Sequence, residues 1–161
     1  MDQRTGSALT TNTANEKSVY KAELRVAADI PAVPTRWLWE KWIPVGRLLI
    51  LAGAGGCGKT TLAMSLAATV SNGSIWPDGA SSQSPGNVLI WSGEDGIADT
   101  VIPRLMAAGA NLDRINIIEG RSGPDGKIRA FNPATDFDLL NAEVERIGNV
   151  ALVIFESPLV S

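Results

Sequence analysis

Histidine is absent from the 161-residue sequence, and cysteine occurs only once, at Cys57. Without histidine the chain has no His-ligated metal site and no Ser-His or Cys-His catalytic pair of its own. A single cysteine excludes an internal disulfide, which fits a reducing compartment such as the cytoplasm. The sequence also lacks a secretory signal and any run approaching the ~18 apolar residues of a membrane helix. We therefore expect a soluble, cytoplasmic protein.

Positive charge is also scarce, because 14 Lys and Arg stand against 17 Asp and Glu for a net charge of −3. The composition thus encodes no large basic surface of the kind that binds nucleic acids, and any contact with DNA must be local. With 45% hydrophobic and 19% charged residues, the chain has an ordinary globular composition. Its length fits a single domain with a real core.

The N-terminal part of the sequence differs in amino-acid composition from the rest. Residues 1–34 are rich in Thr, Ser, Asn and Ala, and they end in Pro31 and Pro34. This composition predicts a flexible segment over residues 1–35, followed by one folded domain over residues 36–161.

Alternating apolar runs and helical periodicities organise the folded part. Four apolar runs predict buried strands, at residues 48–51, 88–91, 114–119 and 150–155. Apolar residues at helical spacing predict helices over residues 62–70, 97–108 and 137–147, the second interrupted by Pro103 and the third capped by Thr135. Strands that are continuous apolar runs separated by helices are typical of a parallel sheet covered on both faces. The predicted fold class is α/β.

The motif G-x-x-x-x-G-K-[ST] follows the first predicted strand and opens the first predicted helix. Its glycines let main-chain N–H groups turn toward phosphate oxygens, and the helix N-terminus adds positive potential. Lys59 would neutralise the β and γ phosphates, Thr60 would place its hydroxyl on Mg²⁺, and Thr61 would donate to the α phosphate. Cys57 is interpreted as a small side chain that fits the loop. The predicted nucleotide-binding residues are Gly53, Ala54, Gly55, Gly56, Cys57, Gly58, Lys59, Thr60 and Thr61.

Hydrolysis also needs a carboxylate that orients and partly deprotonates a water molecule. Glu94 is the candidate, because it follows the second predicted strand, and ligands of open parallel sheets bind at the carboxyl ends of the strands. The alternative is an ordinary acidic loop residue or a cap for the helix that starts near Ile97. Asp95 is the better candidate for that cap.

The fourth predicted strand ends in Phe155-Glu156-Ser157-Pro158, a series of apolar residues followed by an acid. This is the shape of a Walker B strand, whose carboxylate usually binds Mg²⁺ through water. Glu156 is one methylene longer than the usual aspartate, and Mg²⁺ tolerates little geometric slack. Glu156 is therefore either a magnesium-site residue together with Thr60 or an exposed residue at a strand end.

Five tryptophans raise the question of base stacking. Trp91 lies inside a predicted strand, which favours core packing. Trp37, Trp39 and Trp42 precede the first predicted strand, where we expect them to cover a sheet edge or a neighbouring subunit. Trp76 lies in a loop and receives no predicted role.

With these motifs in place, the sequence resembles the RecA-like P-loop ATPases, and more narrowly the AAA family ATPases related to plasmid RepA-type hexameric replicative helicases. The similarity spans residues 36–161 and is strongest in the stretches 42–63, 89–96, 99–110 and 121–140. It implies a three-layer α/β domain, ATP with Mg²⁺ as ligands, and a homo-oligomeric ring or filament. It also implies Lys59 and Thr60 on the phosphates and Glu94 as the water-polarising glutamate, with single-stranded DNA as a partner of regions outside this sequence.

Two departures from the family pattern bear on activity. Glu156 replaces the aspartate that family members usually carry in an IDP-like context. The sequence also ends five residues later, before the strands that in such proteins carry a sensor residue, DNA-facing loops and an arginine finger. On this basis we expect a domain that is incomplete at its C-terminus.

Three functions follow from the sequence. The first is an ATPase domain that couples hydrolysis to work on DNA during replication, and the second is a nucleotide-binding module with little or no turnover. The third, a small-molecule P-loop kinase, is disfavoured because only about a hundred residues follow the phosphate loop. The guanine-reading tetrads N-K-x-D and T-K-x-D are missing, which disfavours a GTPase.

Overall fold

The computed structural model describes residues 22–82, 84–93 and 95–156. It divides into two units, Met1–Pro34 and Thr35–Ser161. In the first unit the described residues form one short 3-10 helix, η1 (Ala27–Asp29), and its apolar side chains Leu24, Val26, Ile30 and Val33 are all exposed.

The second unit is built on a parallel three-stranded sheet in the order β4-β3-β7. The strands are β3 (Asn87–Ser92), β4 (Ile115–Ile117) and β7 (Val150–Glu156). In register, Leu89 lies beside Asn116 on one side and Val153 on the other. The sequence predicted all three strands, although β4 is shorter than the predicted run.

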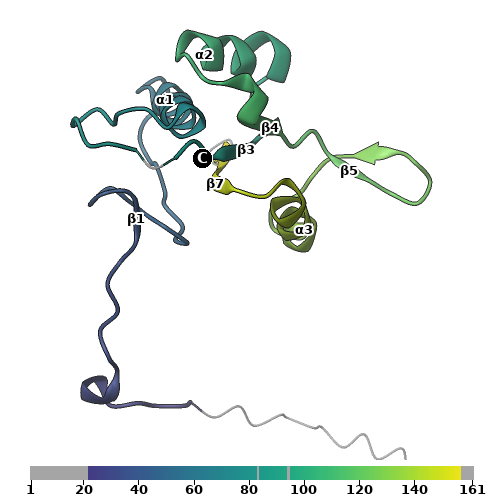
Figure 1. Cartoon of the computed structure of the whole chain (residues 1–161). Helices are drawn as coiled ribbons and strands as arrows, with labels where there is room; N and C mark the ends of the chain where they lie inside the picture. The colour runs from purple at the N-terminus through teal and green to yellow at the C-terminus, as the bar shows by residue number, and fades with distance from the viewer. Residues whose placement is uncertain (1–21, 83, 94, 157–161) are drawn as a thin grey trace, which may run out of the picture. The chain divides into compact units, whose positions relative to one another are not determined.

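Helices pack on both faces of this sheet (Figure 1). Val88 and Ile90 of β3 share a core cluster with residues of α1 (Lys59–Asn72) and α2 (Ile102–Ala107). Leu89, which points to the opposite face, packs instead with Leu140 of α3 (Phe137–Ile147). The arrangement is compatible with an α/β P-loop fold.

The helix boundaries follow local chemistry. Helix α1 ends at Gly73, whose φ of 62° is the left-handed conformation that favours glycine after a helix. The periodic stretch at residues 97–108 forms a π-helical turn, η2 (Ile97–Val101), followed by α2, with Pro103 in the first turn of α2, where a missing N–H is tolerated. The predicted cap of α3 is wrong by one residue, because Asp136 rather than Thr135 precedes the helix.

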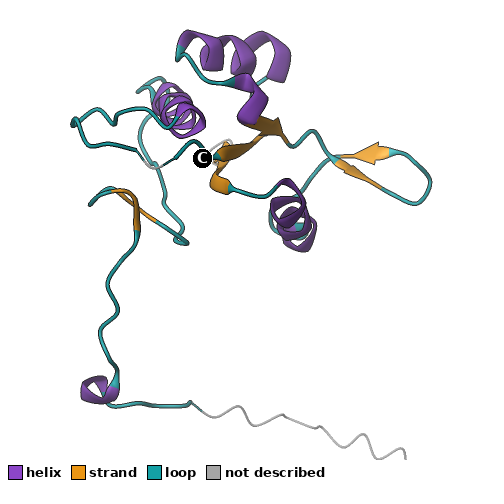
Figure 2. Cartoon of the chain, viewed as in Figure 1, coloured by secondary structure: helices purple, strands orange, loops and turns teal. Residues whose placement is uncertain are grey.

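Two small hairpins complete the unit (Figure 2). Strands β1 (Trp37–Trp39) and β2 (Ile43–Pro44) pair antiparallel. Strands β5 (Arg121–Ser122) and β6 (Ile128–Arg129) form a second antiparallel pair that extends away from the sheet, and a short 3-10 helix, η3 (Leu112–Arg114), leads into β4. Neither hairpin is among the strands that the sequence predicts.

The prediction of a buried strand over residues 48–51 is wrong. This segment has no strand pairing among the described residues, and Leu48 and Ile50 are 85% and 81% exposed. A strand is stabilised by hydrogen bonds to a neighbour and by burial of its side chains, and an apolar run alone supplies neither. Within the described part of the chain β7 pairs only with β3, so its other edge is also unpaired.

Trp39 and Trp76 belong to the core near the first hairpin, whereas Trp42 is 63% exposed. The rings of Trp39 and Trp76 are stacked with centroids 4.9 Å apart, and Trp42 stacks on Trp39 at 5.3 Å. Trp76, to which the sequence assigned no role, is 2% exposed. The Nε1 of Trp39 donates to Asp78, while that of Trp76 has no hydrogen-bond partner among the described residues. Trp91, predicted to be core, lies against Phe131 and Phe155.

Candidate phosphate-binding site

The glycine-rich loop curls tightly before helix α1. Gly56 and Gly58 have φ angles of 75° and 88°, and Gly58 directly precedes the first helical residue. These left-handed conformations are accessible to glycine without strain. A Cβ at Gly53 would lie 2.8 Å from Sγ of Cys57, so the exposed Cys57 side chain would have to shift to accommodate it. Cys57 itself is exposed and forms no disulfide.

Lys59 turns back over this loop. Its Nζ donates to the carbonyl oxygens of Gly53 at 2.9 Å and Ala54 at 3.0 Å. All residues from 53 to 58 are exposed to solvent. The ammonium group therefore lies next to main-chain atoms of its own loop rather than in a salt bridge with a distant carboxylate.

Thr60 and Glu156 meet at the end of the loop. The hydroxyl of Thr60 donates a hydrogen bond to Oε1 of Glu156, and both residues are partly buried. Ser92, at the carboxyl end of β3, donates to Oε2 of the same carboxylate at 3.1 Å. The structure thus brings together the two residues that the sequence predicts for magnesium, and it places Glu156 between two elements rather than as a free strand end.

Asp95 forms an ion pair instead of the predicted helix cap. Gly96 precedes the helical turn η2, and no side chain caps that turn. The carboxylate of Asp95 instead forms an ion pair with Arg104 of α2, at 2.6 Å. The prediction of Asp95 as a helix cap is therefore wrong. Glu94, the predicted water-orienting residue, lies outside the described residues.

The donor set at this place suits a hard divalent cation that is also coordinated by phosphate. Among the described residues no cluster of three or more His, Cys, Asp or Glu side chains could hold a metal by itself. Mg²⁺ usually takes one or two protein oxygens and completes its shell with water and substrate phosphates. The hydroxyl of Thr60 and the carboxylate of Glu156 present oxygen atoms of this kind beside the exposed loop.

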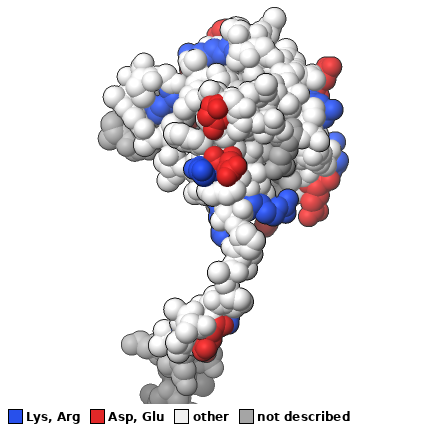
Figure 3. Space-filling model, turned by 60° about the vertical axis from the view of Figure 1, so that its left-hand side comes forward, with Lys and Arg blue, Asp and Glu red and all other residues white. Residues whose placement is uncertain are grey.

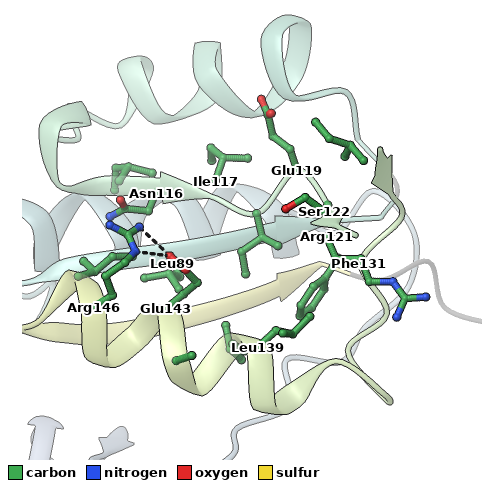
Figure 4. A pocket seen from close by; sticks show the side chains of 17 residues that line it. Leu89, Asn116, Ile117, Glu119, Arg121, Ser122, Phe131, Leu139, Glu143 and Arg146 are labelled. Carbon is green, nitrogen blue, oxygen red and sulfur yellow. Dashed lines mark hydrogen bonds and ion pairs between the residues drawn. The ribbon is translucent and has the colours of Figure 1, made fainter. Parts of the chain in front are cut away.

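A separate cavity of about 650 Å³ lies between β4, the β5–β6 hairpin and α3 (Figure 4). Its floor is apolar, with Leu89 and Phe131, and its rim carries the ion pair of Glu143 with Arg146. None of the phosphate-loop residues line it. It is a hollow on the α3 side of the sheet.

On the face drawn in Figure 3, acidic and basic side chains are interspersed. This face therefore carries no continuous basic surface of the kind that binds nucleic acid. Within the described part of the chain, no helix combines the length and apolar character that a membrane span requires.

A parallel sheet with a glycine-rich loop leading into α1, and with an acidic strand end beside that helix, defines an α/β protein of the P-loop nucleotide-binding class. Comparison with family models assigns the chain more closely: the model of the AAA domain family matches residues 15–157, and the chain belongs to this family. It is thus an AAA-type, nucleotide-binding domain of the ATPase kind. No curated protein and no solved structure matches the chain.

Proposed function

We propose that this chain is a Mg²⁺-dependent ATPase domain of the RepA-type helicase branch, which couples ATP hydrolysis to work on DNA within a homo-oligomeric ring or filament. The observation that carries the catalytic part of this proposal is the contact of Thr60 with Glu156 beside the open loop. It brings a hydroxyl from the first turn of α1 to the acidic end of β7. Family membership supports the nucleotide, and the resemblance of residues 42–63 and 89–96 supports the helicase branch.

Binding would begin with the triphosphate entering the loop. The main-chain N–H groups of residues 53–61 and the positive end of α1 attract phosphate oxygens. Lys59 would exchange its two carbonyl acceptors, Gly53 and Ala54, for oxygens of the β and γ phosphates. This exchange replaces neutral acceptors by charged ones, which strengthens the hydrogen bonds of the ammonium group.

Thr60 and Glu156 would hold Mg²⁺, the carboxylate acting through water. Bound Mg²⁺ supplies positive charge that offsets the charge developing on the phosphates during transfer. Glu94 would accept a proton from the attacking water and orient it toward the γ phosphate. The loop and Lys59 would keep the triphosphate fixed during this step.

Calorimetric titration with Mg·ATP tests the proposal. Lys59→Ala is expected to weaken binding at least about 30-fold, because the phosphates lose their ammonium partner. Lys127→Ala, which removes an exposed lysine from the β5–β6 hairpin, serves as the control and is expected to bind as the parent does. Equal affinity of the Lys59→Ala variant and the parent would refute the assignment of the loop.

A second candidate function is nucleotide binding with little turnover by this polypeptide alone. The exposed segment at residues 48–51 favours it, since this segment leads into the phosphate loop and pairs with no strand among the described residues. Loose positioning of reacting groups lowers the rate more than it lowers affinity. Steady-state ATP hydrolysis, measured with and without single-stranded DNA on a chain of proven affinity, separates the two functions.

A further inference from the structure

The carboxylate of Glu156 is held from two sides by different elements. One oxygen accepts from Thr60 on α1, and the other accepts from Ser92 on β3. The backbone N–H of Gly93 also donates to the carbonyl of Glu156 at 2.9 Å, so the end of β3 is tied to β7 by main chain as well as side chain. Glu156 therefore has little freedom to rotate away from α1.

Ser92 itself is oriented by the next turn of the chain. The N–H of Asp95 donates to Oγ of Ser92 at 3.0 Å. The single hydroxyl proton has two acceptors within reach, the carbonyl of Asp95 and Oε2 of Glu156, both at 3.1 Å. Because a carboxylate is the stronger acceptor, the proton goes to Glu156 and a lone pair receives the N–H of Asp95.

Asp95 is fixed in turn by helix α2. Its Oδ2 lies 2.6 Å from Nη1 of Arg104, and the two side chains are 27% and 43% exposed. A continuous chain of polar contacts thus runs from Arg104 through Asp95 and Ser92 to Glu156. It joins α2 to the carboxyl ends of β3 and β7 and, through Thr60, to the first turn of α1.

We infer that Ser92 is a positioning residue for Glu156, and that the Asp95–Arg104 pair keeps Ser92 in place. This inference rests on the proposed function, in which Glu156 and Thr60 hold Mg²⁺. A glutamate is one methylene longer than the usual aspartate, so its carboxylate has more rotational freedom. The hydrogen bond from the hydroxyl of Ser92 limits this freedom without adding positive charge, so the carboxylate keeps its full attraction for a cation.

These contacts are expected to affect cation affinity more than the stability of the fold. A partly exposed ion pair such as Asp95–Arg104 contributes little to the free energy of folding. Loss of a hydrogen bond that orients a metal-site carboxylate acts instead on cation affinity. Substitutions along the chain of contacts are therefore expected to change Mg²⁺ dependence much more than thermal stability.

The test compares Ser92→Ala with Ser92→Thr and with the exposed helix control Ser65→Ala. ADP affinity is measured by calorimetry in EDTA, and the Mg²⁺ concentration at half-saturation is measured at fixed ADP. Ser92→Ala is expected to raise that concentration about 5–10-fold while affinity in EDTA stays unchanged. Ser92→Thr is expected to restore the parent value, and Ser65→Ala to keep it.

Arg104→Gln provides a second test of the inference. The arginine side chain is exposed, so its replacement is expected to leave the fold intact. It is expected to raise the Mg²⁺ half-saturation about twofold alone and to add nothing when combined with Ser92→Ala. Unchanged Mg²⁺ dependence in Ser92→Ala, or full additivity in the double variant, would overturn the inference. Failure of the parent chain to bind ADP even in EDTA would instead overturn the proposed function itself.

Discussion

The hydroxyl of Thr60 donates a hydrogen bond to the carboxylate of Glu156, although 96 positions separate the two residues in the sequence. The contact joins the first turn of α1 to the last residue of β7. Both residues carry oxygen, the ligand atom that Mg²⁺ prefers. Each of them is therefore a direct target for substitution.

Neutralising Glu156 is the first prediction. Glu156→Gln keeps an acceptor for Thr60 but removes the negative charge, so the Mg²⁺ concentration at half-saturation is expected to rise at least about tenfold. Binding of ADP in EDTA is expected to stay within about twofold of the parent, since no cation is involved. Glu143→Gln on α3 is the matched control. An unchanged Mg²⁺ requirement would remove Glu156 from the metal site.

Glu94→Gln separates binding from turnover. The amide has nearly the same shape as the carboxylate but cannot accept the proton of a water molecule, so ATP is expected to bind normally and hydrolysis to fall at least about 100-fold. Calorimetry and phosphate release measure the two effects, with Glu119→Gln as the control. Hydrolysis at the parent rate would show that another group activates the water.

Leu48→Ala and Leu89→Ala test the exposed position of residues 48–51. Leu89 is 1% exposed in the core, and its truncation is expected to reduce the free energy of unfolding by about 2–5 kcal/mol. Leu48 is 85% exposed, and its truncation is expected to change that free energy by no more than about 0.5 kcal/mol. Urea denaturation measures both. Comparable losses at the two positions would place residue 48 in a packed interior.

Asp78 gives the fold a pH dependence in acid. The hydrogen bond from Trp39, with a smaller effect of the N–H of Ala80, lowers the pKa of Asp78 below its ordinary value of 3.8. A carboxyl group whose pKa is lower in the folded state stabilises the fold above the unfolded pKa, and this contribution is lost as pH falls through the folded pKa.

Thermal unfolding of Asp78→Asn checks this prediction. The variant is expected to be less stable than the parent at neutral pH, and the difference is expected to shrink as the pH is lowered below about 3.8. Asp113→Asn, which changes another exposed aspartate, controls for the loss of one negative charge. A stability difference that stays constant through the acid range would contradict the role of the Trp39 hydrogen bond.

Local chemistry explains which parts of the fold could be predicted from the sequence. Helix α1 could be predicted because the apolar spacing indicates a helix and Gly73 indicates its end. Strands β3 and β7 could be predicted because each is an apolar run that ends at polar residues. Residues 48–51 present the same apolar signal but have no neighbouring strand among the described residues. An apolar run indicates a preference for burial, and it does not specify the partner that would provide it.

The same limit applies to the candidate site. The contact of Thr60 with Glu156 could be anticipated, because the carboxyl ends of parallel strands meet at one edge of the sheet beside the loop. Ser92 lies at the same edge, but a single serine at a strand end carries no distinguishing pattern. The pairing of Asp95 with Arg104 depends on how α2 folds back, and spacing alone favoured a helix cap for Asp95.

The parallel indoles of Trp39 and Trp76, inclined by only 2°, give the protein an optical reporter of its own. Indole rings stacked in a folded core are expected to produce a near-ultraviolet circular dichroism band that disappears once side-chain packing is lost. The signal arises where the β1–β2 hairpin meets the loop after α1, so it follows docking of that hairpin without a dye.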